Sequence, residues 1–324
     1  MKVLCIGSAV MDIMGYPIDQ RKEWKEKQRI SDIRILPGGD AVNQSVYMAQ
    51  LGAEPALVCC VGQDMNGKIL RSTLKEMQVD VSLVKEKGDC ATGTAMVLVS
   101  EDGERRTFSV QGAHSTLCAG DVPKVEDLPE SCMAISLASL FSMPEWEANG
   151  LLEYLKEAKE KGLLVFADLA ADKLGLGLEG IRRFLPYIDY FLPSLYDILD
   201  MTETSTAEEA AEAFHKLGVA NVVIKCGERG CYYSGRGFAE GRSVNDSTQS
   251  DEICGWAPSL AVHVVDTTGA GDCTVAAFVS RILKGDSLGQ ACRYACAAGS
   301  LSTTFAGAST AVLEDEKLMY LSQS

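Results

Sequence analysis

One stretch of the sequence combines a bare backbone with a carboxylate at the start of an apolar segment. It reads Val264-Val265-Asp266-Thr267-Thr268-Gly269-Ala270-Gly271-Asp272, and the apolar segment 273–283 follows. Because Gly269, Ala270 and Gly271 have almost no side chains, their backbone N–H groups can converge on an anion where a helix N-terminus adds its positive dipole end. Asp272 could then accept the proton of a hydroxyl that attacks a phosphoryl group. The spacing predicts a phosphate cradle beside a general base.

The same residue types would also suit a plain turn. An isolated Gly-x-Gly-Asp is often a tight turn followed by a first-turn acid that complements the helix dipole. The full string from Asp266 to Asp272 is much more specific. It resembles the C-terminal signature of the ribokinase-like (PfkB) carbohydrate kinases, and this resemblance favours the anion site over the plain turn.

A second stretch resembles the N-terminal signature of the same family. It reads Pro37-Gly38-Gly39-Asp40-Ala41-Val42-Asn43 and runs on to Ala49-Gln50-Leu51-Gly52. Paired glycines before a helix let the backbone approach a ligand closely, and Asn43 offers a donor and an acceptor to hydroxyls. Asp12 matches the family aspartate that holds sugar hydroxyls, although by itself it would also suit a solvated turn. We expect Asp12, Gly38, Gly39 and Asn43 to bind the substrate.

The resemblance extends to about Ala308 and implies an activity. The expected reaction is ATP-dependent and Mg²⁺-dependent phosphorylation of a hydroxyl on a small sugar or sugar-like molecule, with Asp272 as general base and residues 269–271 as anion hole. In this family the nucleotide lies along the carboxyl edge of the sheet. The implied cofactor-binding residues are Lys225, Gly227, Thr267 and Ser302. Asp266 and Thr268 match the place of a monovalent cation, so K⁺ is expected to raise the activity.

Two positions depart from the family pattern. Relatives usually carry Asn-x-x-Glu after a mid-chain strand, where this chain has Pro193-Ser194-Leu195-Tyr196-Asp197. Asp197 keeps a carboxylate, and we expect it to reach Mg²⁺ through water. Asp168 is a further candidate where relatives often carry Asp-x-Asn, but Ala170 cannot hydrogen-bond through its side chain. Metal handling and substrate contacts are therefore expected to differ here.

Short apolar runs alternate with amphipathic segments along the chain. The predicted strands are residues 3–7, 56–61, 133–137, 163–167, 190–192 and 222–226, and the predicted helices are residues 145–161, 207–217, 271–283 and 288–303. This alternation predicts a largely parallel sheet covered by helices on both faces, with ligands at the carboxyl ends of the strands. Residues 235–258, rich in Ser, Asp, Gly and Asn, predict a surface loop.

One region breaks the alternation. Residues 94–100, an Asp102-Gly103 turn and residues 105–110 predict a β-hairpin without a helix, either a lid or an extension of the sheet. The resemblance implies the lid. The expected fold is a three-layer α/β/α sandwich with a mostly parallel central sheet and a small β-sheet lid. It forms a single kinase domain over residues 1–324, with lid strands from about 12–36 and 93–111.

Composition excludes other classes of function. The net charge of -15 leaves no broad basic surface, so neither nucleic acid nor an anionic membrane is an expected partner. The N-terminal apolar run is too short for a signal peptide, and no stretch reaches the roughly 18 apolar residues of a membrane span. The 12 cysteines are scattered without a C-x-x-C pair and the 3 histidines lie far apart, which predicts buried thiols in the cytoplasm and no zinc site.

Alternatives remain at this stage. A nucleoside kinase of the adenosine or pseudouridine type would share both signatures. A non-catalytic sugar-binding sensor would keep the pocket without turnover, an idea prompted by Ser194 and Asp197. Arg105 and Arg106 in the hairpin could bind a phosphorylated sugar. Exchange of lids between two chains would form a homodimer.

Overall fold

A computed structural model describes residues 2–19, 21–22, 25, 27–101, 104–236 and 254–323. Its main sheet has eight strands in the order β14-β13-β12-β11-β10-β9-β1-β4. The parallel strands are β4 (Glu54–Val58), β1 (Lys2–Gly7), β9 (Cys132–Leu140), β10 (Leu164–Leu169), β11 (Tyr190–Phe191) and β12 (Asn221–Lys225). β13 (Cys231–Gly235) and β14 (Cys254–Ala257) continue the sheet antiparallel. The central strands are apolar on both faces because helices cover both, as in parallel sheets generally.

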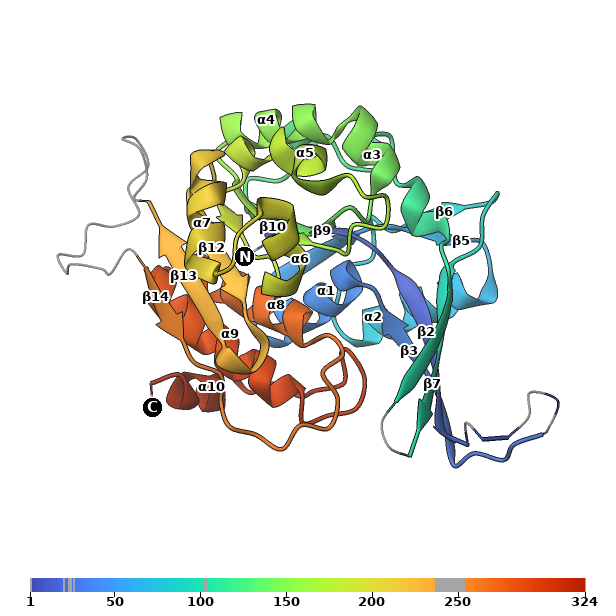
Figure 1. The fold of residues 1–324 in the computed structure, drawn as a ribbon. Coiled ribbons are helices and arrows are strands. Elements are labelled where there is room, and N and C mark those ends of the chain that lie inside the picture. Colours follow the sequence, from blue (N-terminus) through green and yellow to red (C-terminus); the bar gives the residue numbers. More distant parts are fainter. Residues whose placement is uncertain are drawn as a thin grey trace.

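The two faces of this sheet carry different sets of helices (Figure 1). One face is covered by α3 (Pro144–Asn149), α4 (Leu151–Glu160), α5 (Gly177–Arg182), α6 (Leu195–Thr202) and α7 (Ala207–Lys216). The other is covered by α1 (Asp40–Gln50), α8 (Ala270–Leu283), α9 (Leu288–Ser302) and α10 (Asp315–Leu321). α2 (Met65–Glu76) packs beside α1.

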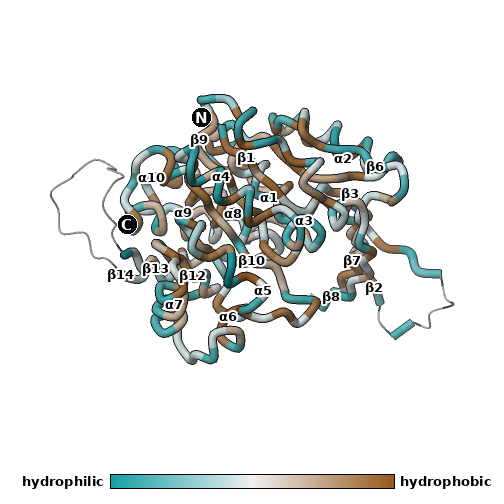
Figure 2. Tube along the Cα trace, turned by 90° about the horizontal axis from the view of Figure 1, so that it is seen from above, coloured by the Kyte–Doolittle hydropathy of each residue, from teal (hydrophilic) through white to brown (hydrophobic). Residues whose placement is uncertain are grey.

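Alternation along each strand supplies both layers of the core. In β9, Ile135 and Leu137 pack in the first layer, whereas Ala134 packs in the second. Phe166 of β10 belongs to the second layer, where it stacks on Tyr190 with ring centroids 4.8 Å apart. In Figure 2 the most hydrophobic parts of the chain gather in the strands and in the helix faces beside them. This arrangement confirms the predicted three-layer α/β/α fold.

A second, four-stranded sheet projects from the body (Figure 1). Its order is β3 (Asp32–Gly38), β2 (Val10–Ile18), β7 (Gly93–Ser100) and β8 (Arg105–Val110). β7 and β8 pair antiparallel, which confirms the predicted hairpin, while its turn at Asp102-Gly103 lies outside the described residues. A separate pair, β5 (Cys60–Gly62) and β6 (Lys85–Lys87), is parallel.

Three predicted elements were wrong in detail. The helix expected over 145–161 is divided at Gly150, where an added Cβ would lie 3.0 Å from Cδ1 of buried Trp146. The strand expected over 56–61 is split, because its last residues leave the main sheet to pair with β6. Within the loop expected over 235–258, residues 254–257 form strand β14, where the ring centroids of Trp256 and Tyr232 are 5.4 Å apart. Residues 237–253 lie outside the described part of the chain.

The prediction of buried thiols is confirmed for most cysteines, while Cys254 is exposed and Cys90, Cys118 and Cys226 are partly buried. All 12 cysteines are free, and most of them are buried in the core layers. In the described part of the chain, no helix combines the length and the apolar content that crossing a bilayer requires.

Candidate active site

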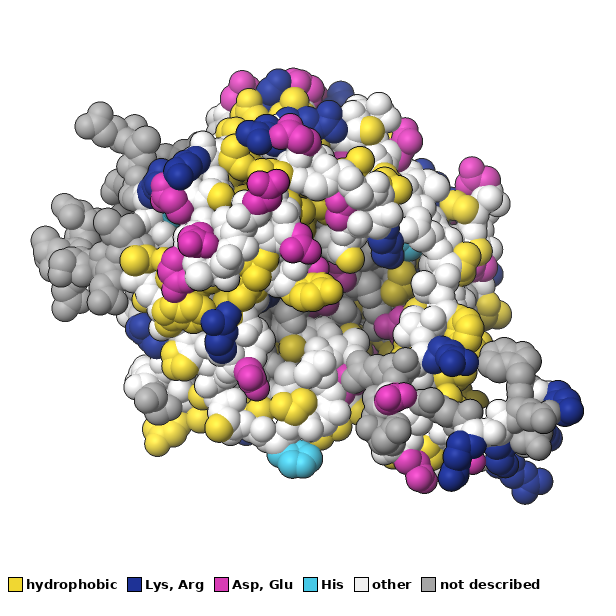
Figure 3. Space-filling view, viewed as in Figure 1, with side chains coloured by type: hydrophobic (Ala, Val, Ile, Leu, Met, Phe, Trp, Pro, Cys, Tyr) yellow, Lys and Arg dark blue, Asp and Glu magenta, His cyan; other side chains and the backbone are white. Residues whose placement is uncertain are grey.

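A cavity of about 590 Å³ opens at the carboxyl ends of the parallel strands, beside the second sheet. Figure 3 shows this face of the molecule hollowed near its centre, with acidic side chains in the hollow. The polar side chains of its wall come from both ends of the sequence; they are Ser8, Asp12, Asp40, Asn43, Gln111, His114, Ser142, Asp168, Lys173, Ser194, Lys225, Thr268 and Asp272. The two sequence signatures therefore meet at one cavity, in the place where open α/β sheets bind ligands.

The C-terminal signature forms a tight junction between a turn and α8. Gly269 is the N-cap residue, with φ of 73°, and a Cβ there would lie 2.3 Å from the carbonyl oxygen of Ala308. Only glycine fits this conformation and this contact. Next to it, Gly271 is open toward the cavity, and the nearest atom to an added Cβ would be Nζ of Lys225 at 3.5 Å. Open backbone, the start of a helix and a lysine together favour an anion here.

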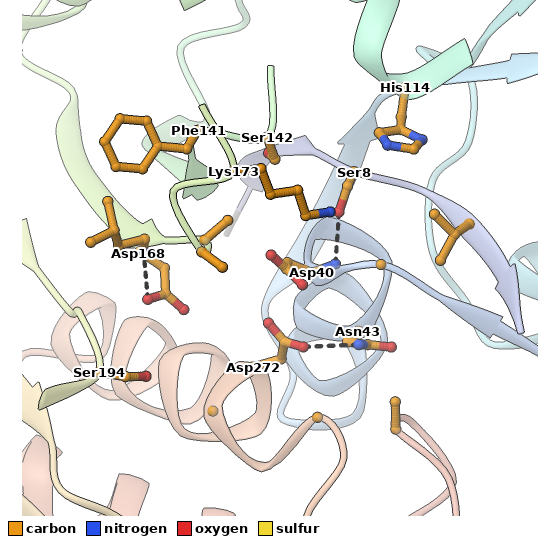
Figure 4. Close-up of a pocket in the computed structure, with 18 of the residues that line it drawn as sticks. Ser8, Asp40, Asn43, His114, Phe141, Ser142, Asp168, Lys173, Ser194 and Asp272 are labelled. Carbon is orange, nitrogen blue, oxygen red and sulfur yellow. Dashed lines mark hydrogen bonds between the residues drawn. The ribbon is translucent and has the colours of Figure 1, made fainter. Parts of the chain in front are cut away.

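Asp272 follows at once and is held by amides from the other signature. Nδ2 of Asn43 donates to its Oδ2 at 2.8 Å (Figure 4), and Nε2 of Gln44 donates to its Oδ1 at 3.3 Å. The side chain is buried, which raises the pKa of Asp272 well above its usual range; the charge of Asp40 raises it further, and the Asn43 hydrogen bond opposes the shift. A buried carboxylate with a raised pKa is suited to accepting a proton.

The N-terminal signature forms a second junction, between β3 and α1. A Cβ on Gly38 would lie 2.2 Å from Oδ2 of Asp12, and a Cβ on Gly39 would lie 2.7 Å from the carbonyl oxygen of Ser8. Burial raises the pKa of Asp12 to about 6. Oδ1 of Asn43 is buried without a hydrogen-bond partner among the described residues. A ligand with several hydroxyl donors would satisfy both groups.

Comparison with known proteins then fixes the family. Residues 1–315 match the sequence profile of the pfkB family carbohydrate kinases. The chain belongs to this family. Its relatives include the ribokinase of Mus musculus, 30% identical over 281 residues (85% of this chain and 80% of that protein), and the ribokinase of Haemophilus influenzae, 28% identical over 291 residues (86% and 85%).

Solved structures agree with the family assignment. The Arabidopsis thaliana ribokinase, complexed with ribose and ATP, superposes with a TM-score of 0.79 at 25% identity, covering 100% of this chain and 98% of that chain. An E. coli protein assigned as a ribokinase II, complexed with ATP and Mg²⁺, gives a TM-score of 0.81 at 24% identity, with 99% of each chain covered. This pfkB kinase is thus a phosphotransferase that acts on an alcohol group and uses ATP with Mg²⁺.

Lys225 lines the cavity beside Gly271 at the start of α8. Its Nζ donates to Oδ2 of Asp168 at 2.6 Å, and both side chains are largely buried. Ser194 also lines the cavity, whereas Asp197 lies in the first turn of α6. Burial raises the pKa of Asp197, and the positive charge of Lys225 opposes this shift. The Asp197 carboxylate is therefore close enough to Lys225 to interact with its charge.

The residues present fit nucleotide phosphates and a water-bridged metal. The start of α8 at Gly271 and the ammonium of Lys225 could supply donors for phosphate oxygens, whereas the Ala270 N–H donates to the Thr267 carbonyl oxygen at 3.2 Å. In the described ranges, no group of three or more His, Cys, Asp or Glu side chains could hold a metal ion by itself. Mg²⁺ commonly binds through one or two carboxylates plus phosphates and water, and Asp168 or Asp197 could serve in that way.

Asp266 and Thr268 shape the turn that leads into α8. The backbone N–H and Oγ1 of Thr268 donate to Oδ1 of Asp266 at 2.8 and 2.6 Å, and the Gly307 N–H donates to Oδ2 at 2.9 Å. The carboxylate thereby ties the turn to the segment containing Ala308, against which Gly269 packs. The cation expected at this place stays a prediction.

Three expected cofactor residues lie away from the cavity wall. Gly227 and Thr267 are exposed. Ser302 is buried at the end of α9, and its Oγ donates to the Gly299 carbonyl oxygen at 2.8 Å. Ser302 differs from expectation because hydroxyls in the last turn of a helix readily bond backward to their own backbone.

Sequence reasoning missed several residues of the wall and of the hydrogen bonds that hold it. Asp40 lay inside the quoted signature, but a first-turn acid is so common that its type carried no signal. Gln44 and Lys173 belonged to no pattern. Ser139 bonds to Asp40 from 99 positions away, a distance over which the sequence gives no pairing information.

Proposed function

We propose that this pfkB kinase phosphorylates a hydroxyl of a small sugar or sugar-like molecule, with Asp272 as the general base. The observation that carries the proposal is the position of Asp272. Its carboxylate faces the cavity one residue after Gly271, and it is held by Asn43 of the opposite junction. The proton acceptor therefore lies between a site suited to hydroxyls and a site suited to phosphate.

The roles follow from this placement. Asp12 and Asn43 accept and donate hydrogen bonds to the substrate hydroxyls, with the backbone of Gly38 and Gly39 close enough to exclude water. Asp272 takes the proton of the attacking hydroxyl at a carboxylate oxygen. Bound Mg-ATP supplies the phosphoryl group.

The amides of residues 269–271 and the ammonium of Lys225 stabilise the charge that develops on the phosphoryl oxygens. These groups are in position before the reaction, so little reorganisation is needed when the charge appears.

A nucleoside is the second candidate acceptor. The aminoimidazole riboside kinase of Salmonella typhimurium is 27% identical over 323 residues, covering 96% of this chain and 92% of that protein. The far end of the cavity, near Phe141, Pro144 and Leu174, is apolar enough to accept a base attached to a ribose.

One experiment separates the candidates. ADP release with Mg-ATP is measured across pentoses, hexoses, sugar acids and nucleosides, with Asp272→Asn as the control. The substrate with the highest kcat/KM names the class, and a free sugar should exceed every nucleoside. A nucleoside winner would replace the sugar proposal, and full activity of Asp272→Asn would overturn the role of the base.

We also propose that the second sheet acts as a lid and pairs with the lid of a second copy. Residues directly opposite on neighbouring strands share a face, and Ile13 is opposite both Ile35 and Met96, with Met96 opposite Phe108. Asp12, one position away, points to the other face and lines the cavity. Apolar side chains on the outer face are exposed to 65% (Ile33), 55% (Ile35), 44% (Met96), 45% (Phe108) and 60% (Val110).

So many exposed apolar side chains on one sheet face favour a partner surface of the same kind. Phe108→Lys should give a monomer in light scattering after gel filtration. The control Thr107→Lys, on the opposite face, should leave the dimer intact. A wild-type monomer at micromolar concentration would contradict the proposal.

Two further parts of the proposal concern conditions. Asp266 and Thr268 at the base of the α8 turn support activation by K⁺, which should disappear when a bulky organic cation replaces it at equal ionic strength. Equal rates in K⁺ and in the organic cation would exclude the cation role.

Use of ATP and the 12 free cysteines support a cytoplasmic location.

A further inference from the structure

Asp40 is a carboxylate of the cavity wall to which the proposed reaction gives no role. It lies in the first turn of α1, three positions before Asn43, so the two side chains leave the same side of the helix. Asn43 binds Asp272 at 2.8 Å. Figure 4 shows Asp40 and Asp272 beside each other in the cavity, projecting from α1 and α8.

A hydrogen-bond network fixes the position of Asp40. Oγ of Ser139 donates to its Oδ2, and its own backbone N–H donates to Oγ of Ser8 at 3.0 Å. Ser142 Oγ in turn donates to the Ser139 carbonyl oxygen at 2.6 Å. The carboxylate is therefore oriented from the end of β9 as well as from α1.

The backbone that supplies this clamp is strained. Ser139 has φ of 102° and Phe141 has φ of 72°, a region that residues other than glycine rarely adopt. Such strain persists where the surrounding structure enforces it, and it gathers at functional sites. Here its effect is to direct the Ser139 hydroxyl onto Asp40.

We propose that Asp40 is a positioning residue for the reaction, whose negative charge, when ionised, makes Asp272 a stronger proton acceptor. This inference rests on the proposed role of Asp272 as general base. Asp40 acts through space: a negative charge that faces the base favours the proton-bound form of Asp272, and so the step in which the hydroxyl proton moves to it.

The other groups around Asp272 do not replace this charge. The groups that face it are Asn43, Gln44 and Tyr47 from α1, Asp168 from β10, Lys225 from β12, Cys5 from β1 and Cys273 from α8. Asp168 is paired with Lys225 at 2.6 Å, so the two charges largely cancel. Asp40 forms no ion pair within the described residues, and its effect on the pKa of Asp272 is second only to burial. Asp12 is not among the charges that act most on Asp272.

The ligand-free pair should titrate together. Two carboxylates that face one cavity cannot ionise independently, so the last proton leaves the pair at a higher pH than it would leave Asp272 alone. Removing the charge of Asp40 therefore moves the ionisation of Asp272 to lower pH. A purely structural role for Asp40 would leave that ionisation in place.

The test is the pH profile of kcat/KM with the best substrate of the panel. The value of kcat/KM falls on the acidic side as the base becomes protonated. Asp40→Asn should shift this acidic limb to lower pH by about one unit and should lower the maximum kcat/KM about tenfold. Ser139→Ala keeps the charge and should move the limb less. Asp12→Asn removes a carboxylate from the same cavity and should raise the sugar KM without moving the limb.

A second readout needs no turnover. NMR titration of ¹³C-labelled aspartates in the ligand-free protein should show the Asp272 carboxyl ionising at lower pH in Asp40→Asn than in the wild type. An unchanged limb and an unchanged titration, with only the sugar KM raised, would overturn the inference and leave Asp40 as a substrate contact. If Asp272→Asn proved fully active, the general base would fail separately, while the titration would still report the coupling.

Discussion

The cavity has two glycine-to-helix junctions, each with a positive-φ glycine before the helix but with different charged neighbours. Gly39 precedes α1 with φ of 95°, and Gly269 precedes α8 with φ of 73°. At the α1 junction the neighbouring side chains are acids, Asp12 and Asp40. At the α8 junction the neighbour of Gly271 is Lys225. The helix start is thus common to both, and in the proposed reaction the surrounding charges would decide whether hydroxyl donors or phosphate oxygens bind.

Asp272 connects the two junctions, since it lies in the first turn of α8 and accepts a hydrogen bond from Asn43 of α1. Replacing it should therefore have the largest effect. Asp272→Asn keeps the shape but cannot accept the proton, so kcat should fall by about 10² to 10⁴, while ATP affinity changes only a few fold. Steady-state kinetics with nucleotide binding by calorimetry checks both numbers; a fall in ATP affinity alone would assign Asp272 to the phosphate side.

The α8 junction should separate folding from chemistry. Gly271→Ala places its Cβ 3.5 Å from the nearest atom, so the protein should fold normally, but the methyl group enters the anion site and kcat/KM for ATP should drop about 10². Gly269→Ala is the contrast, because its Cβ would lie 2.3 Å from the Ala308 carbonyl oxygen, and it should unfold at a lower temperature. Similar melting temperatures for both variants would contradict the view that Gly269 is needed for folding and Gly271 for activity.

The α1 junction should show the energetic cost of its acids. The pKa of Asp12 rises from 3.8 to about 6 in the folded protein, so between these values the native state holds a proton that the unfolded chain has lost. Stability from this group is present below pH 4 and is lost as pH rises through about 6. Asp12→Asn should therefore be more stable than the wild type at pH 7.5 by roughly 3 kcal/mol, with little difference at pH 4.

Urea unfolding at both pH values measures this difference. A constant gap between Asp12→Asn and the wild type from pH 4 to pH 7.5 would mean that the carboxylate is not destabilised by burial.

Gly38→Ala should have the mildest effect of the series. Its Cβ would lie 2.2 Å from Oδ2 of Asp12, the free end of a side chain, which can rotate away. The hydroxyl contacts of Asp12 would weaken, and the sugar KM should rise about tenfold with kcat nearly unchanged. A change in the ATP KM instead would show that the two junctions are not as separate as their charges indicate.

The sequence was most informative where the signal was local. Helices α7, α8 and α9 and the parallel strands followed from periodicity, and the residues of both junctions followed from bare backbone next to an acid or an amide. Gly150 was read as part of one helix because a glycine inside an amphipathic run does not reveal that its backbone leaves the helical conformation, with φ of −164° and ψ of −25°.

Long-range partners were invisible for a different reason. The Ser139 clamp on Asp40 joins positions 99 residues apart, and it depends on a strained φ that neither residue type indicates. Ser302 was expected at the nucleotide, and in this structure its hydroxyl donates to the Gly299 carbonyl oxygen within α9; its nucleotide role stays a prediction.

The hydrogen bonds from α1 to Asp272 have a consequence for synthesis of the protein. Asn43 and Gln44 precede their acceptor by 229 and 228 positions, so a ribosome must release most of the chain before the amides and the carboxylate can meet. A nascent chain that ends before α8 would already carry the turn proposed to bind hydroxyls but would lack the proposed base. Unfinished copies would thus be inert, and catalysis would begin only when synthesis is nearly complete.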